Sequence, residues 1–102
     1  MLIPFDFGVK MNIIVAFQGT IVATGVPQLL PNNPVRNGIT ICGKTTNAAS
    51  MAISDQPTVS VSTGYLLEKG IPAFIPLTGT GANTLQLYIV GTSGDKFSVV
   101  GS

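Results

Sequence analysis

Apolar and polar residues alternate in short runs along most of the chain. Ile39 and Ile41 alternate with Thr40 and Cys42, for example. Side chains on a β-strand point to opposite faces in turn, so each such run places one face in a core. Breakers rich in Gly, Pro and Asn separate the runs. The pattern predicts eight short strands, near 12–17, 20–24, 37–43, 50–54, 58–63, 72–78, 85–90 and 96–100.

The spacing of these strands indicates the fold class. Strands that recur every roughly 8–12 residues, each followed by a turn signal, are typical of a sandwich or a barrel. The one helix candidate, Tyr65 to Lys69, is closed by Gly70 and is too short to persist alone, so we expect a corner or a single turn. The sequence therefore predicts an all-β domain over residues 12–102, either a single β-sandwich or a small barrel of short antiparallel strands.

The first eleven residues differ from the rest of the chain, because they form an apolar strip ahead of the first clear strand. One interpretation is an additional edge strand or cover for the domain's own sheet. The other is an arm that docks on another chain, since terminal segments are ordered only when something holds them. We expect a partner interface in this arm, formed by Leu2, Ile3, Phe5, Phe7 and Val9.

Composition narrows the choice of partner. Apolar residues make up 45% of the 102 residues and charged residues 9%, with a net charge of +1. This balance indicates one folded domain and argues against disorder. The few basic residues are scattered singly, so we expect neither nucleic acid nor an anionic membrane as a partner. So little charge favours self-association, and we expect a homo-oligomer.

The sequence also predicts neither a membrane span nor a signal peptide. The longest unbroken apolar run, Ile13 to Phe17, is too short to span a bilayer. The N-terminus has no basic region and no cleavage site, so we expect no signal peptide and synthesis in a reducing cytoplasm.

The chain carries few groups suited to catalysis or metal binding. It has no histidine, and Cys42 is its single cysteine, so a disulfide within the chain and a zinc or copper site are excluded. Cys42 also lacks the usual base that would activate it, and we expect an inert, partly buried thiol. The four carboxylates lie beside turn signals or a chain end, where solvated side chains are expected: Asp6, Asp55, Glu68 and Asp95. We expect no enzyme activity and no cofactor.

The aromatic residues offer one weaker possibility. Tyr65, Tyr88 and five Phe residues could stack on sugar rings, but most occupy positions whose parity suggests the core. Packing is therefore the expected role of these aromatics, and sugar binding remains an alternative.

The order of several segments resembles that of a known group of proteins. These segments are the turn Arg36-Asn37-Gly38 with the strand Ile39-Thr40-Ile41, the run Val59-Ser60-Val61, the stretch Gly64 to Gly70 followed by Phe74-Ile75-Pro76-Leu77, and the closing hairpin from Leu87 to Gly101. Together they are similar to the small decoration, cement or head-fibre proteins of tailed bacteriophage heads. Residues 1–20 lie outside the resemblance.

The resemblance implies a jelly-roll-like or related β-sandwich on the outer surface of a capsid. Such a protein binds there as a dimer or trimer, bridges subunits of the major capsid protein and helps the head to resist internal DNA pressure. A second function stays open at this point, namely a carbohydrate- or receptor-binding β-sandwich module of a phage tail or fibre.

Overall fold

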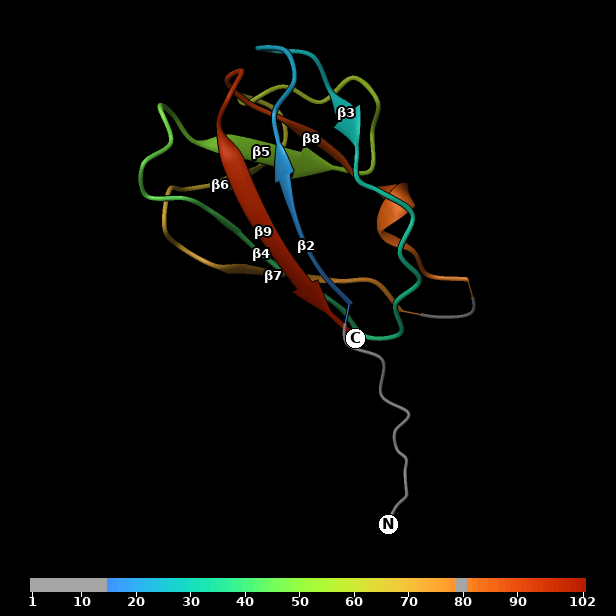
Figure 1. Ribbon diagram of the computed structural model, residues 1–102. Coiled ribbons are helices and arrows are strands. Elements are labelled where there is room, and N and C mark those ends of the chain that lie inside the picture. The colour runs from blue at the N-terminus through green and yellow to red at the C-terminus, as the bar shows by residue number, and fades with distance from the viewer. Residues whose placement is uncertain (1–14, 79–80) are drawn as a thin grey trace.

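The computed structural model describes residues 15–78 and 81–102. These residues form two antiparallel sheets of four strands each, packed face to face (Figure 1). The first sheet has the order β2-β9-β4-β7 and the second the order β3-β8-β5-β6. The strands are β2 (Val15–Thr20), β3 (Gln28–Leu29), β4 (Gly38–Gly43), β5 (Met51–Ser54), β6 (Tyr65–Leu67), β7 (Ala73–Pro76), β8 (Tyr88–Val90) and β9 (Lys96–Gly101), with a 3-10 turn η1 at Thr84–Gln86. The all-β prediction is confirmed, and the sheets form a sandwich with no closed barrel in the described part of the chain.

The pairing of the strands follows one long hairpin. β2 pairs with β9, β3 with β8, β4 with β7, and β5 with β6, all antiparallel. The first half of the fold therefore runs beside the second half in reverse, and the tip of the hairpin is the 55–64 connection. Successive pairs lie alternately in one sheet and the other. Winding a hairpin in this way gives the eight-stranded jelly-roll arrangement.

The period-2 pattern places the core between the two sheets. Ile39 and Ile41 on β4 are fully buried, and so is Ile89 on β8 of the opposite sheet. Phe97 and Val99 on β9 also point inward and are 2% and 3% exposed. One apolar face from each sheet thus closes the sandwich, as the alternation predicted.

Five of the eight predicted strands are confirmed with shifted ends, and a sixth, near 12–17, overlaps β2 at residues 15–17. The predicted strand at 20–24 is wrong, because the chain leaves the sheet after Thr20. There the N–H of Val26 donates to the carbonyl of Ala23, in a turn that Gly25 allows with a φ of 73°. The second strand of the fold forms later, at β3.

The predicted strand at 58–63 is also wrong, because this segment covers a sheet instead of joining it. Val59 is 4% exposed and packs on the outer face of the second sheet with Ala52 and Val90. Gly64 makes this approach possible, because an added Cβ there would lie 2.5 Å from a methyl carbon of Val59. The corner expected at Tyr65 to Lys69 is instead strand β6, which pairs with β5 immediately after the cover.

Two polar side chains hold the β4–β5 loop against the start of β9. The carboxylate of Asp95, 6% exposed, accepts hydrogen bonds from the N–H groups of Ala48 and Ala49 at 2.8 and 3.2 Å. Asn47 donates to the carbonyl of Lys96 and accepts from its N–H, both at 2.8 Å. The Asn47 side chain therefore makes the same paired bonds with Lys96 that a neighbouring strand would make.

We predict that Asp95→Ala lowers the free energy of unfolding by about 2–3 kcal/mol, because it leaves two partly buried N–H groups without acceptors. Chemical denaturation measures this loss. Asp55→Ala is the matched control, since Asp55 is exposed and its carboxylate meets the side chain of its neighbour Gln56. It should change stability by less than about 0.5 kcal/mol. Equal effects of the two variants would contradict the role given to Asp95.

Candidate interaction surface

The five residues expected at a partner interface, Leu2, Ile3, Phe5, Phe7 and Val9, lie outside the described residues. Their contribution to binding stays a prediction. The described residues nevertheless contain surface features that the sequence did not reveal, and these define the candidate site.

The candidate carboxylates of the described residues lie in separate loops, and Asp6 lies outside the described residues. Asp55 follows β5, Glu68 follows β6, and Asp95 precedes β9, where it serves the loop contacts described above. Among residues 15–78 and 81–102, no cluster of three His, Cys, Asp or Glu side chains could hold a metal ion. Cys42 is half-buried, as expected, and its thiol lies 3.4 Å from the carbonyl of Gly43. No helix in the described part of the chain is long and apolar enough to cross a membrane.

The outer face of the first sheet carries a row of small and apolar side chains in register. Ala16 on β2 pairs with Val100 on β9, which pairs with Thr40 on β4, which pairs with Phe74 on β7. Phe74 is 60% exposed and Val100 45% exposed. A shallow depression of about 260 Å³ adjoins Phe74 and Val100 where β4 begins. We call this surface the outer row, defined by Ala16, Val100, Thr40 and Phe74.

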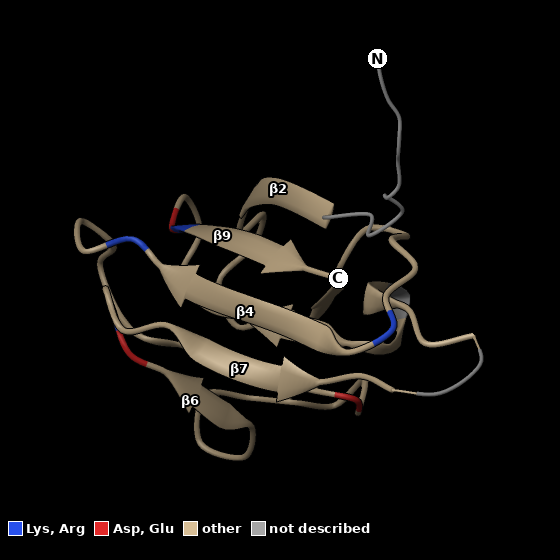
Figure 2. Cartoon of the chain, turned by 90° about the horizontal axis from the view of Figure 1, so that it is seen from below, with Lys and Arg blue, Asp and Glu red and all other residues tan. Residues whose placement is uncertain are grey.

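Charge is almost absent from this face. Figure 2 shows the charged residues at the loops and strand ends that surround the sheet. Within the four strands the single charged residue is Lys96, the first residue of β9, and its ammonium group lies 3.3 Å from the hydroxyl of Thr20. A partner can therefore cover the outer row without burying an unpaired charge.

The size of the face limits how strongly it binds alone. Four strands about 4.8 Å apart and about 20 Å long present roughly 400 Å². A stable interface buries about 800 Å² on each partner. The face by itself supports a weak contact, which many copies or a second binding segment must reinforce.

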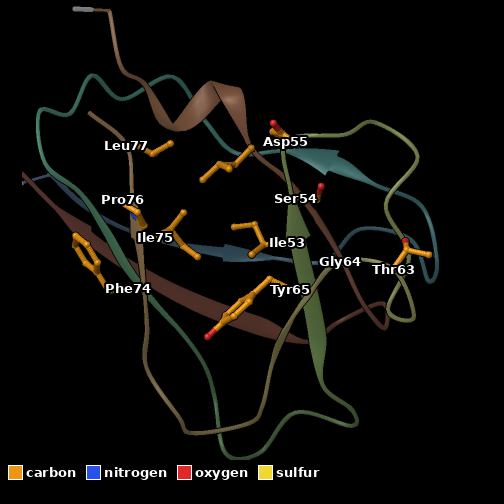
Figure 3. A pocket seen from close by; sticks show the side chains of 11 residues that line it. Ile53, Ser54, Asp55, Thr63, Gly64, Tyr65, Phe74, Ile75, Pro76 and Leu77 are labelled. Atoms are coloured by element: carbon orange, nitrogen blue, oxygen red, sulfur yellow. The ribbon is translucent and has the colours of Figure 1, made fainter. Parts of the chain in front are cut away.

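A groove of about 540 Å³ opens beside this face, where β7 of the first sheet meets β5 and β6 of the second. Ile53 and Ile75 point toward each other across it (Figure 3). Tyr65, which is 60% exposed, stands at its side. Ser54 and Asp55 line one end, whereas Thr63 lies well apart from them. The groove pairs an apolar floor and an exposed aromatic ring with hydroxyl and carboxylate oxygens.

The expectation that the aromatic residues mostly pack in the core does not hold for Phe74 and Tyr65, which are both 60% exposed. In the run Ala73-Phe74-Ile75-Pro76-Leu77 both parities are apolar, so the alternation does not say which face enters the core. The register decides it, because Ala73 and Ile75 pair with the inward-facing Ile41 and Ile39. Tyr65 was expected in a helical turn, whereas it lies on β6, an edge strand of the second sheet, where its ring is exposed.

The chain matches no protein-family model, and the comparisons with curated proteins and with solved structures give no match either. A fold alone does not specify a function, so the function must be inferred from the surface residues.

We predict that Phe74→Ala changes the free energy of unfolding by about 0.5 kcal/mol or less, because the ring is mostly exposed. Phe97→Ala removes a buried ring from the core and should cost about 3–5 kcal/mol. Thermal or denaturant unfolding of both variants measures the difference. A large loss for Phe74→Ala would mean that the ring serves folding and that the outer row is no free contact surface.

Proposed function

We propose that this protein is a non-enzymatic structural protein of a tailed bacteriophage head. It decorates the outer surface of the capsid after synthesis in the host cytoplasm, and it stabilises the shell by bridging subunits of the major capsid protein. The observation that carries the proposal is the outer row on a nearly uncharged sheet face, with the exposed side chains Phe74 and Val100.

The physical argument rests on the weakness of each contact. The first sheet presents about half of the area that a stable pairwise interface needs. On an assembled shell, many equivalent sites and an additional apolar segment, Leu2 to Val9, multiply the effect of such contacts. A protein that binds the assembled lattice better than its free subunits stabilises the lattice by mass action.

Phage heads that lack this protein provide the test. The purified chain should co-sediment with them and raise the temperature at which they lose their DNA. Phe74→Asp and Val100→Asp should each weaken binding by about tenfold or more, because a charge would be buried against the shell. Val61→Asp is the matched control, since Val61 is 51% exposed but belongs to the loop that covers the other sheet. Failure of the unmodified chain to bind heads would end the proposal.

Deletion of residues 1–9 tests the apolar segment separately. The deletion leaves all the described strands in place, so the domain should keep its β circular dichroism and its unfolding midpoint. Head binding should fall, because the segment adds contact area that the sheet face lacks. Full binding after the deletion would assign attachment to the sheet face alone.

The groove favours a second candidate, a carbohydrate- or receptor-binding module of a phage tail or fibre. Jelly rolls occur among lectin domains as well as viral capsid domains. The exposed Tyr65 ring lines this groove and offers a stacking surface for a sugar, and the oxygens of Ser54 and Asp55, at the other end, offer hydrogen-bond acceptors. A glycan array separates the candidates, because a decoration protein should bind no sugar on it. Binding that Tyr65→Ala abolishes would favour the second candidate.

A further inference from the structure

The two sheets end in four edge strands that differ in their ability to accept another strand. β3 and β6 are edges of the second sheet and contain two and three residues. Very short edge strands offer little backbone to pair with. The edges of the first sheet are β7 and β2, with four and six residues, and they need a closer comparison.

Prolines close the edge of β7. Leu77 donates its N–H to the carbonyl of Asn37, so odd-numbered residues of β7 bond to β4. Successive residues direct their backbone groups to opposite sides, so Phe74 and the residues two positions on either side of it face the open edge. Those two neighbours are Pro72 and Pro76, which have no N–H to donate. The edge of β7 therefore offers a single donor, at Phe74.

The edge of β2 has no such protection. Ile21 donates its N–H to the carbonyl of Asp95, so odd-numbered residues of β2 bond to β9. Ala16, Gln18 and Thr20 consequently direct their backbone groups to the free edge. No other strand among residues 15–78 and 81–102 pairs there. The strand contains neither proline nor charge, the features that commonly blunt an edge.

A side chain marks where this open stretch ends. Gln28 donates from Nε2 to the carbonyl of Thr20 at 3.1 Å and accepts at Oε1 from the N–H of Val22 at 2.9 Å. These two bonds occupy the C=O of Thr20 and the N–H of Val22, as a paired strand would. Within residues 15–78 and 81–102, no partner bonds to the N–H and C=O of Ala16 and Gln18 or to the N–H of Thr20.

We propose that β2 pairs with β2 of a second copy of this chain, antiparallel across a two-fold axis at Gln18. In that register Gln18 faces Gln18 of the second copy, and Ala16 faces Thr20. On the inner face, Phe17 comes opposite Gly19 of the second copy, and the Phe97 ring lies over that glycine in place of a side chain. The strand contains no charged residue, so the pairing brings no like charges together. The pairing joins two four-stranded sheets into one of eight strands and removes both open edges.

The dimer goes beyond the proposed function and does not depend on it, because its formation requires no phage head. It also joins the two nearly uncharged outer faces into one continuous surface. Edge pairing buries a modest area, so the dimer should dissociate on dilution. The dissociation shows as a fall in weight-average mass when the full chain is diluted about a hundredfold in sedimentation equilibrium.

Substitution of Gln18 tests the pairing directly. Gln18→Pro removes an N–H that the domain itself does not use, so the variant should keep the β circular dichroism spectrum and become monomeric. Gln18→Ala is the matched control; it keeps the N–H and should remain dimeric. A monomeric unmodified chain, or a Gln18→Pro variant that still forms dimers, would overturn the proposal.

Cysteine cross-linking provides a second measurement that does not require a proline to fit the strand. In a Cys42→Ser background, Gln18→Cys should form a disulfide-linked dimer on mild oxidation. Ser98→Cys is the matched control, because Ser98 lies beside Gln18 on the same outer face but on the interior strand β9. It should not cross-link. Cross-linking at position 98 without cross-linking at 18 would assign the contact to the sheet face and reject edge pairing. A full chain that is monomeric, with dimers forming only after deletion of residues 1–9, would mean that the chain covers its own edge.

Discussion

Strand β9 hydrogen-bonds on both sides, and the arrangement of the first sheet depends on it. The backbone groups of its odd-numbered residues hydrogen-bond to β2, near the beginning of the fold, and those of its even-numbered residues hydrogen-bond to β4. The first sheet is complete only when β9, the last strand, lies between β2 and β4. Because β9 fixes both registers, it also fixes which side chains point inward and which backbone groups are left at the edge of β2.

The surface follows from these registers. Phe97 and Val99 enter the core, so Val100 must point outward, and it aligns with Thr40 and Phe74 across the sheet. At one edge Pro72 and Pro76 leave Phe74 as the single donor, whereas at the other edge no strand among residues 15–78 and 81–102 pairs with β2. A nearly uncharged face with an exposed Phe74 and Val100 is the main surface feature that these registers produce.

The alternation of apolar and polar residues was sufficient to predict the fold class and most strands, because strand parity is local. It failed where a segment packs on a sheet without joining it. The run from Pro57 to Thr63 has the β-branched residues of a strand, yet Val59 covers Ala52 and Val90 from outside. The exposure of Phe74 was missed because apolar residues on both parities leave the buried face of its run undefined, and that of Tyr65 because a helical turn was expected there.

The sequence by itself determined an all-β domain with little charge, no histidine and a single cysteine, because composition and period-2 patterning need no knowledge of distant contacts. The tertiary structure alone decided which apolar residues remain exposed, which edges stay open and where Asp95 is used. Those outcomes depend on pairs such as Thr40 with Phe74 and Ala48 with Asp95, whose members are far apart in the chain. Register between distant strands is a property of the assembled sheets, and no local pattern specifies it.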